Sequence, residues 1–241
     1  MEKWAWQVAS YAIGRDYHKT LGGMLKRLAA KIQEIAPNEQ LKYYVDTGPL
    51  LEKAIAEQAG IGRIGKNSLL ITPEFGSWVF LAEIISTMDL VEKDQHANSP
   101  KEAHWRSSDK PSFNICGNCT KCIDACPTGA IVEPGVIDSK LCISYLTIEN
   151  RDSIPPHLAK KIKKLKLLYG CDICQAVCPH NSARQKITTQ PDFLKEIAGE
   201  QHALQPLSKM NTHKEMVDKF AGSALMRAGY RGMRRNARIN L

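Results

Sequence analysis

The chain has 241 residues, 43% of them hydrophobic, which is enough for an ordinary globular core. Its longest apolar run, from Trp78 to Ile85, is interrupted by Glu83 and is far shorter than the roughly 20 residues of a membrane-spanning helix, so we expect no membrane contact. Residues 1–19 lack the apolar stretch and cleavage site of a secretory signal, and we therefore expect a cytoplasmic protein. The formal charge of +8 permits an acidic partner such as nucleic acid.

The first half of the chain alternates between helical and strand patterns. Apolar residues recur at helical spacing from Leu21 to Ile35, and the segment from Lys42 to Asp46 is short, aromatic and β-branched, which predicts a helix followed by a strand. A second helix is expected from Pro49 to Gln58, ending at Gly60. Asp46 would then lie in a strand-to-helix turn.

The remaining elements are a strand, a connection and two basic helices. We expect a buried strand from Ser77 to Ile85 and a polar surface connection from Val91 to Phe113. Lysines surround Ile162, Leu165 and Leu168, which predicts an amphipathic helix with a basic outer face. Two glycines weaken the helix prediction for the C-terminus, where five arginines follow at three- to four-residue steps. These are Arg227, Arg231, Arg234, Arg235 and Arg238.

Eight cysteines lie between Cys116 and Cys178, and reduced, clustered cysteines usually bind metal or act in redox chemistry. The first four have the spacing C-x2-C-x2-C-x3-C-P of bacterial ferredoxins, in which the fourth cysteine binds the other cluster. They are Cys116, Cys119, Cys122 and Cys126, followed by Pro127. Two-residue gaps let three thiolates cap one face of a 4Fe-4S cluster, and the longer gap directs the fourth thiolate away.

The second cysteine block, Cys171, Cys174 and Cys178 followed by Pro179, has the spacing C-x2-C-x3-C-P and so lacks the first cysteine of a complete run. Cys142, further upstream, completes the count of four. Following the crossover, we assign one cluster to Cys116, Cys119, Cys122 and Cys178. The other cluster is assigned to Cys126, Cys142, Cys171 and Cys174. The alternative is two zinc sites with four thiolates each, which the paired ferredoxin-type blocks make much less favourable.

Motifs outside the cysteine blocks point to one enzyme family. In order along the chain they are Gly14-Arg15-Asp16-Tyr17-His18, Val45-Asp46-Thr47-Gly48-Pro49, Gly62-Arg63-Ile64-Gly65-Lys66-Asn67, Cys126-Pro127-Thr128-Gly129-Ala130, Cys142-Ile143-Ser144-Tyr145-Leu146-Thr147 and Gly170-Cys171-Asp172-Ile173-Cys174-Gln175. With these motifs the chain resembles the epoxyqueuosine reductases over nearly its whole length. Simple ferredoxins do not share the motifs outside the clusters.

The resemblance implies a cobalamin-dependent enzyme with two 4Fe-4S clusters, which reduce the cobalt to Co(I). Its activity would be the reduction of epoxyqueuosine to queuosine at the wobble position of tRNA. Asp46 would donate a proton to the departing oxygen. The implied cobalamin-binding residues are Asp46, Asn67, Leu70, Ser144 and Asp172. The implied partners are tRNA carrying epoxyqueuosine and an external electron donor such as a flavodoxin or ferredoxin system.

Several of these residues have simpler interpretations. On the residues alone, Asp46 is more readily a helix cap or turn residue. The segment from Gly60 to Asn67 almost matches a phosphate-binding loop, but Asn67 replaces the Ser or Thr and the segment follows a helix, so we reject nucleotide hydrolysis. A glycine-rich turn is an equal alternative to corrin contact there. The scattered histidines, His18, His180 and His213, show no metal-binding spacing and are assigned no chemistry.

We therefore predict an α+β protein in three parts. Residues 1–110 would form a partial α/β cobalamin-binding portion, 111–184 a ferredoxin-like two-cluster domain, and 185–241 a helical segment that begins a helical-repeat region. Family members usually have further segments at both ends, so the resemblance implies a truncated chain. Two basic segments favour phosphate contact in a tRNA enzyme. The alternatives are a plain two-cluster electron-transfer module, which leaves Asp46 without a role, and a corrinoid reductive dehalogenase, which the basic charge disfavours.

Overall fold

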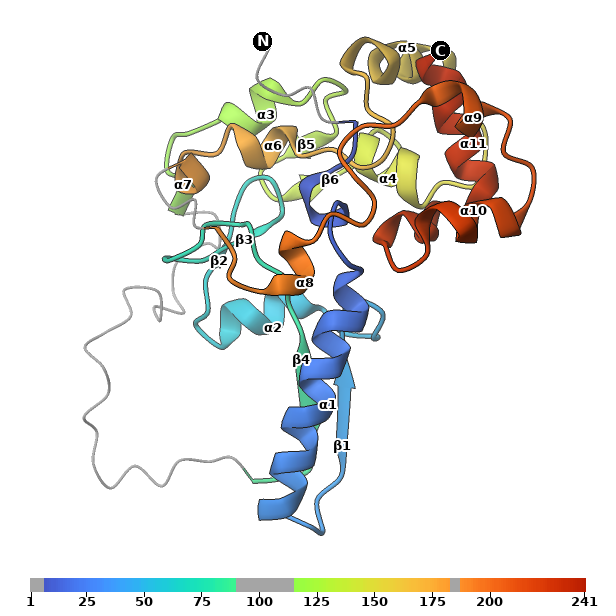
Figure 1. Cartoon of the computed structure of the whole chain (residues 1–241). Helices are drawn as coiled ribbons and strands as arrows, with labels where there is room; N and C mark the ends of the chain where they lie inside the picture. The colour runs from blue at the N-terminus through green and yellow to red at the C-terminus, as the bar shows by residue number, and fades with distance from the viewer. Residues whose placement is uncertain (1–6, 90–114, 183–186) are drawn as a thin grey trace.

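The computed structural model describes residues 7–89, 115–182 and 187–241 as a mixture of helices and short antiparallel strands (Figure 1). The predicted surface connection from Val91 to Phe113 lies outside these residues. Within them, no helix combines the length and the apolar character needed to cross a membrane. The α+β fold class is confirmed.

A long helix and a two-stranded ribbon form an arm that projects from the rest of the molecule (Figure 1). Helix α1 (Tyr17–Ile35) begins where the side chain of Asp16 accepts a hydrogen bond from the backbone N–H of His18, which is a typical N-cap. Strands β1 (Leu41–Tyr44) and β4 (Glu83–Ser86) pair antiparallel beside it. The predicted first helix and strand are confirmed.

The predicted buried strand from Ser77 to Ile85 is wrong in both extent and burial. Only Glu83–Ser86 is a strand, and it is partly exposed because it lies in a sheet of two strands. The residues before it, Ser77 to Leu81, line a cavity instead. Apolar residues that face a cavity produce the same sequence pattern as a strand that is buried in a sheet.

A helix and a hairpin lie at the base of the arm. Helix α2 (Glu52–Gln58) starts later than predicted and leads to β2 (Arg63–Ile64) and β3 (Leu70–Ile71), which pair antiparallel. A Cβ atom on Gly62 would lie 2.5 Å from the carbonyl oxygen of Ile71, so this close approach requires glycine.

Four short helices and one hairpin make up the region that contains the cysteines, most of which lie in the loops between these elements. The elements are α3 (Lys121–Ala125), β5 (Ile131–Glu133), β6 (Val136–Ile137), α4 (Ile143–Ile148), α6 (Ile173–Ala176) and α7 (Pro179–Ser182). Helices α3 and α6 contain Cys122 and Cys174 and pack against each other, which brings the two cysteine blocks together.

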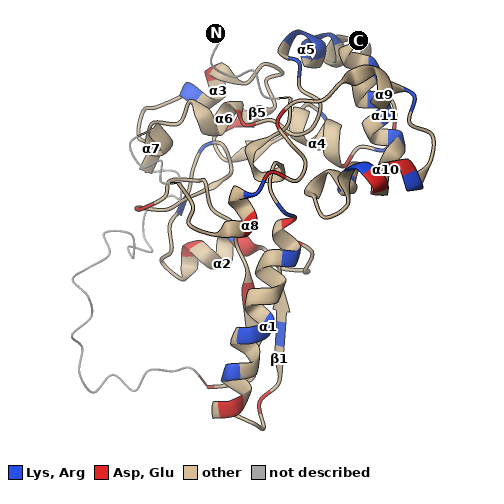
Figure 2. Ribbon diagram, viewed as in Figure 1, with Lys and Arg blue, Asp and Glu red and all other residues tan. Residues whose placement is uncertain are grey.

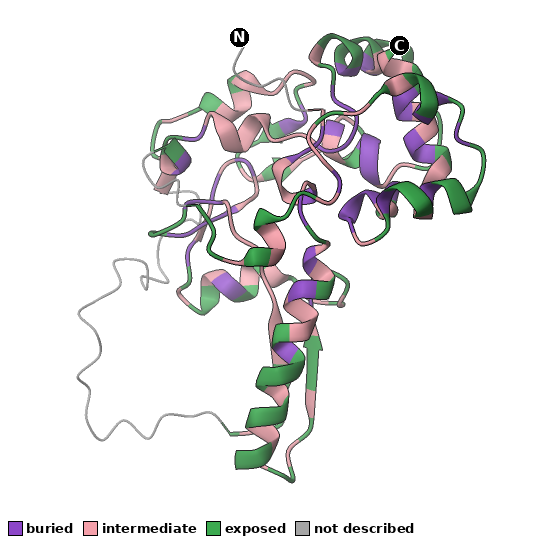
Figure 3. Cartoon of the chain, viewed as in Figure 1, coloured by how far each residue is buried: buried purple, intermediate pink, exposed green. Residues whose placement is uncertain are grey.

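The C-terminal part is helical, as predicted. Its elements are α5 (Pro156–Leu165), α8 (Pro191–Leu194), α9 (Leu204–Ser208), α10 (His213–Phe220), η3 (Ala224–Ala228) and α11 (Gly229–Asn240), with η1 (Ser10–Ala12) contributed by the N-terminus. Helix α11 contacts α4, α5, α9, α10 and η3, and its inner face is buried (Figure 3). Gly232 lies on that face beside Ala228, where a small residue permits close packing.

The largest hydrophobic core draws on all three predicted segments of the chain. Val8 and Ala12 come from the first segment, Leu168 and Tyr169 from the second, and Met233 from the third. A parallel β-bridge between Val8 and Tyr169 fixes the first contact. The boundaries at 110 and 184 stay a prediction.

Candidate active site

A cavity of about 800 Å³ lies between the base of the arm and the cysteine-bearing region. Aromatic side chains form much of its wall: Tyr11, Tyr17, Trp78, Phe80, Tyr145 and Phe193. Asp46 and Glu52 border it from the loop after β1 and from the start of α2, and Cys142 and Ser144 border it from the start of α4. The volume falls within the usual range for cofactor and ligand sites.

Asp46 lies in the loop between β1 and α2, in a left-handed backbone conformation with φ of 57°. The hydroxyl of Tyr17 donates a hydrogen bond to its Oδ2 at 2.5 Å, and its backbone N–H donates to Oε1 of Glu52 at 2.6 Å. Helix α2 begins after Leu51 and has no side-chain cap, so the helix-cap interpretation of Asp46 is wrong. The side chain remains 60% exposed and borders the cavity.

His18 lies beside this aspartate. Its Nε2 is 3.7 Å from Oδ2 of Asp46, and its Nδ1 is 2.8 Å from Oδ1 of Asp16. The ring stacks on Tyr17, with centroids 4.1 Å apart, and Tyr17 stacks in turn on Phe80. The sequence analysis assigned His18 no chemistry because this residue lacks metal-binding spacing. The useful signal was its position in the Gly14–His18 motif.

Burial fixes the ionisation of the tyrosine that holds Asp46. Desolvation raises the pKa of Tyr17 well above its usual value, and the hydrogen bond to Asp46 and the charge of that carboxylate raise it further. The phenol therefore keeps its proton and acts as a hydrogen-bond donor. Tyr11, deeper in the same wall, also has a raised pKa, mainly through burial.

Two groups of four thiols follow from the assignment made on the cysteine spacing, and burial and neighbouring thiols shift the pKa of members of both groups. Burial raises the pKa of Cys122 and Cys178, and negative charge on Cys116 raises both further. Cys119 acts on Cys178 in the same way.

The second group contains the remaining four thiols. Burial raises the pKa of Cys171 to about 12 and also raises that of Cys174, and charges on Cys142 and Cys126 contribute to both shifts. Cys174 is also influenced by Cys122 of the first group. Neutral thiols of this kind lose their protons when they bind metal.

All eight cysteines are free thiols, and among the described residues no group of three or more His, Cys, Asp or Glu side chains is placed to hold a single metal ion.

The Gly62–Asn67 motif joins the β2–β3 hairpin to both cysteine blocks. Lys66 donates from its backbone N–H to Sγ of Cys116 at 3.5 Å, and its Nζ donates to the carbonyl oxygens of Gly117 and Cys119. Asn67 donates to the carbonyl oxygen of Cys174 at 3.4 Å. The motif therefore supports the cysteine loops, and hydrogen bonds of this kind to cysteine sulfur tune the potential of a cluster.

A second sulfur hydrogen bond lies in the other thiol group. The backbone N–H of Ala130 donates to Sγ of Cys126 at 3.2 Å. Burial acts to raise the pKa of Cys126, but hydrogen bonds from Thr128 and from nearby backbone N–H groups outweigh it and lower the pKa.

The predicted cobalamin-binding residues separate into two sets. Asp46 and Ser144 line the cavity, whereas Asn67 and Leu70 are buried behind it. Asn67 accepts a hydrogen bond from the backbone of Leu69, which does line the cavity. Asp172 is half-buried, and desolvation raises its pKa; its Oδ2 accepts hydrogen bonds from the backbone N–H and the hydroxyl of Ser10 on the cavity wall at 2.7 and 2.6 Å.

These features define a two-cluster iron–sulfur protein with a cofactor-sized cavity beside one group of cysteines. A family model described as a 4Fe-4S double cluster binding domain matches residues 115–181. A second model, described as epoxyqueuosine reductase QueG, DUF1730, matches residues 2–47.

Curated relatives extend this match to nearly the whole chain. The epoxyqueuosine reductase of Gloeobacter violaceus is 42% identical over 98% of this chain and 69% of its own length. That of Synechocystis sp. is 42% identical over 98% of this chain and 75% of its own length. The chain belongs to the epoxyqueuosine reductase family.

Solved structures have the same fold. The epoxyqueuosine reductase from Bacillus subtilis, in a form with its catalytic aspartate loop swung out of the active site, superposes with a TM-score of 0.79 at 33% identity. An epoxyqueuosine reductase with an epoxyqueuosine-modified tRNA-Tyr stem loop gives the same values. The Streptococcus thermophilus enzyme gives 0.77 at 34%. The chain spans 57% of the length of each of these structures, with 98% of its own length aligned.

Proposed function

We propose that this chain reduces epoxyqueuosine in tRNA to queuosine. The observation that carries the proposal is that one cavity is bordered both by Asp46, a carboxyl group held by a buried tyrosine, and by Cys142, a cysteine of the second thiol group. Removing an epoxide oxygen as water consumes electrons and protons together. A cavity bordered by both an acid and a redox centre meets both needs.

Two 4Fe-4S clusters would supply the electrons. Cys126, Cys142, Cys171 and Cys174 would hold the cluster nearest the cavity, because Cys142 borders it. Cys116, Cys119, Cys122 and Cys178 would hold the outer cluster. The loop from Gly117 to Thr120 is largely exposed beside the outer group, so an external flavodoxin or ferredoxin system would deliver electrons there.

The same cavity would hold cobalamin. Its aromatic walls suit a large planar ring, and both Asp46 and Ser144 present polar atoms to it. Asn67, Leu70 and Asp172 would support these walls from behind. When bound, cobalamin would supply a strongly nucleophilic metal centre for the carbon–oxygen bond.

The protein's own groups would manage the proton and the surrounding water. Asp46 would protonate the oxygen as it leaves, and Tyr17 would fix the orientation of the carboxyl group through its short hydrogen bond. Glu52 would hold the backbone of the loop in place. Phe80 and Trp78 on the cavity wall would exclude water from the reacting atoms.

A basic surface formed by α5 and α11 would bind tRNA phosphates. Neither Pro156–Leu165 nor Gly229–Asn240 contains an acidic residue, and Figure 2 shows blue Lys and Arg segments on both helices. The two helices pack together. The exposed lysines of α5 and of its C-cap are Lys160, Lys161, Lys163, Lys164 and Lys166. Phosphate contact requires such uncompensated positive charge.

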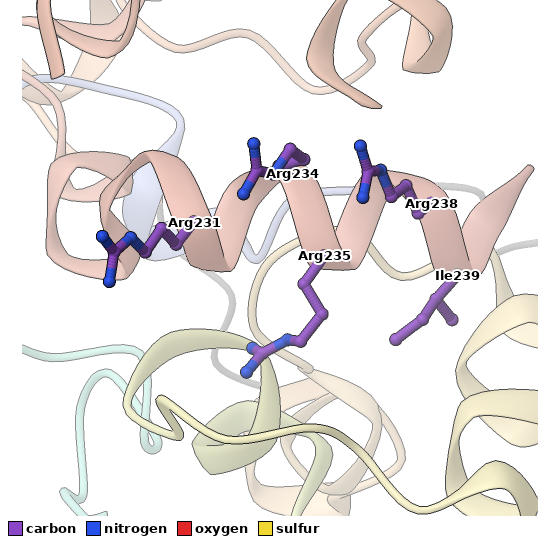
Figure 4. A pocket seen from close by; sticks show the side chains of 5 residues that line it. All are labelled: Arg231, Arg234, Arg235, Arg238 and Ile239. Carbon is purple, nitrogen blue, oxygen red and sulfur yellow. The ribbon is translucent and has the colours of Figure 1, made fainter. Parts of the chain in front are cut away.

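The five C-terminal arginines do not act as one stripe. Arg235 donates to three main-chain carbonyl oxygens, of Leu146, Asn150 and Asp152, and Arg227 pairs with Glu149. Arg234 and Arg238 point to the opposite side of α11 from Arg235, and together with Arg231 they border a surface hollow of about 370 Å³ (Figure 4). We assign phosphate contact to these three, each of which uses one nitrogen in a bond to a neutral group.

The test is conversion of a defined substrate. Anaerobically purified protein with reconstituted clusters and added cobalamin is incubated with an epoxyqueuosine-modified tRNA stem loop and a strong reductant. We expect queuosine in the digested RNA, about eight irons per chain and a cobalt content that rises on loading. Absence of queuosine from protein that holds both clusters and cobalamin would overturn the proposal and leave an electron-transfer module.

A further inference from the structure

The proposed reaction needs more protons than Asp46 carries. Reduction of an epoxide to an alkene follows the balance epoxide + 2 electrons + 2 protons → alkene + water. One proton is taken when the first carbon–oxygen bond breaks and a hydroxyl forms, and the other when that hydroxyl leaves as water. Asp46 holds one proton at a time, so it must be recharged within each turnover.

Two of the groups that contact Asp46 are poor sources of this proton. Tyr17 donates the short hydrogen bond to Oδ2, but burial raises its pKa far above the neutral range, so it keeps its proton. Glu52 accepts from the backbone N–H of Asp46, and its Oε1 is occupied by that bond. Both groups hold the loop in position.

His18 has the geometry of a proton source. Its Nε2 faces Oδ2 of Asp46 at 3.7 Å, and its Nδ1 lies 2.8 Å from the Asp16 carboxylate. An imidazole can carry a proton near neutral pH, and a carboxylate on its far nitrogen orients the ring and stabilises the charged form. Asp16 also accepts from the backbone N–H of His18, so one carboxylate fixes both the backbone and the ring.

We propose that His18, oriented by Asp16, supplies the second proton through Asp46. Asp46 first protonates the epoxide oxygen and becomes a carboxylate. The imidazolium of His18 then transfers its Nε2 proton to that carboxylate, and Asp46 protonates the departing hydroxyl, which leaves as water while the alkene forms. The two electrons come from the low-potential iron–sulfur centres, and neutral His18 regains a proton from water. This role rests on the proposed function.

The transfer requires a small closure of the site. A separation of 3.7 Å is an ion-pair contact and exceeds hydrogen-bond length, and catalytic contacts commonly tighten when substrate binds. His18 remains 33% exposed, so water can reach it for reprotonation. The ring lies against Tyr17 at an interplanar angle of 33°, a contact that restricts its movement.

The first test compares His18→Gln with His213→Gln, an exposed histidine on α10, in the cluster- and cobalamin-loaded chain. Loss of a general acid typically costs about 10²- to 10⁴-fold, so kcat of His18→Gln should fall by that range, with KM for the stem loop unchanged. Imidazole in the buffer should partly restore His18→Ala and should not restore His18→Ala combined with Asp46→Asn. A structural role would show no such rescue.

The second test does not depend on turnover. The imidazole of His18 faces Asp16, Asp46 and Tyr17, and the chemical shifts of its ring are followed by NMR in the chain without tRNA. A change in a group that contacts the ring alters its magnetic environment, so these chemical shifts should change in both Asp16→Asn and Asp46→Asn, whereas those of His213 should not. Unchanged ring shifts of His18 in Asp46→Asn would overturn the contact on which the proposal depends.

The outcomes separate this inference from the proposed function. If loaded wild-type protein forms no queuosine, the proposed function falls, and the second-proton role falls with it. If wild type forms queuosine and His18→Gln turns over at the same rate, the proposed function stands and only the role of His18 is overturned.

Discussion

Asp46 shows how a single residue acquires a role from its surroundings. A carboxylate in a strand-to-helix turn is most simply a cap, yet its side chain accepts from Tyr17 and faces His18 across the cavity edge. The positive φ of Asp46 is a conformation that Asp tolerates better than most residues, which lets the side chain turn away from the helix.

The first prediction is that Asp46→Asn loses most turnover while keeping both clusters and corrinoid. Asparagine has a similar size but cannot supply the proton, so the rate should fall by about 10²- to 10⁴-fold. Asp218→Asn, on the exposed face of α10, is the matched control. Conversion of the stem loop and iron content are measured for both. Turnover by Asp46→Asn equal to that of wild type would remove the acid assignment.

The second prediction concerns the anchor of the Asp46 loop. Glu52→Ala removes the acceptor for the backbone N–H of Asp46, so that amide should exchange with solvent faster and kcat should fall. The relative from Bacillus subtilis has been seen with its catalytic aspartate loop swung out, which shows that such a loop can move in the family. Glu34→Ala, on the exposed end of α1, should change neither quantity. Equal exchange rates in wild type and Glu52→Ala would contradict this anchor.

At the scale of elements, a one-dimensional pattern predicted local structure well and burial poorly. The helix of α1, the strand β1 and the amphipathic α5 follow from periodicity alone. The strand expected from Ser77 to Ile85 failed because its apolar residues face a cavity. Helix α11 formed despite its glycines, because Gly229 lies at its first position with a φ of 64°, where glycine is favoured, and packing outweighs the cost of about 1 kcal/mol at Gly232.

The ribbon of β1 and β4 should make stability depend on pH. Burial, followed by the charge of Glu52 and a hydrogen bond with it, raises the pKa of Glu83 to about 7 from a model-peptide value of 4.5. Between these values the folded state binds more protons than the unfolded state. The contribution of Glu83 to the free energy of unfolding is therefore fully present below about pH 4.5 and is lost as the pH rises to 7. Glu83→Gln should flatten this dependence in urea unfolding. A slope identical to that of wild type would contradict the raised pKa.

Helix α11 gives a prediction about RNA. Replacing Arg231, Arg234 and Arg238 with glutamine should weaken stem-loop binding and make it less salt-dependent. With fewer phosphate contacts, binding releases fewer counterions from the RNA. The matched control replaces three exposed lysines of the arm, Lys26, Lys31 and Lys42, with glutamine. Affinity is measured at several salt concentrations. Equal losses in both triple variants would show a general charge effect and exclude a specific surface.

At the scale of the whole molecule, long-range contacts decide what the sequence could not. The cysteine spacing predicted a two-cluster 4Fe-4S domain, which the family model over residues 115–181 confirms, whereas the assignment of each cysteine to a cluster stays a prediction. The sharing of one core by Val8, Tyr169 and Met233 was not predictable, since nothing local links residues so far apart in the chain. The same holds for His18, because its proposed role depends on its contact with Asp46, which lies 28 positions further along the chain.

A single cavity is bordered by Asp46 and by Cys142 of the second thiol group, and the proposed reaction draws its electrons from both clusters. The consequence is a fixed ratio between the electrons lost from the protein and the queuosine formed. Two 4Fe-4S clusters, each reduced by one electron, store the two electrons that one epoxide consumes.

A single-turnover experiment measures that ratio most directly. The cluster- and cobalamin-loaded chain is reduced, freed of external reductant and mixed with epoxyqueuosine-modified stem loop, and cluster oxidation is followed by electron paramagnetic resonance while queuosine is quantified. The account predicts two electrons lost from the protein for each queuosine formed. Clusters that stay reduced in the presence of substrate, or that become oxidised without queuosine, would contradict it.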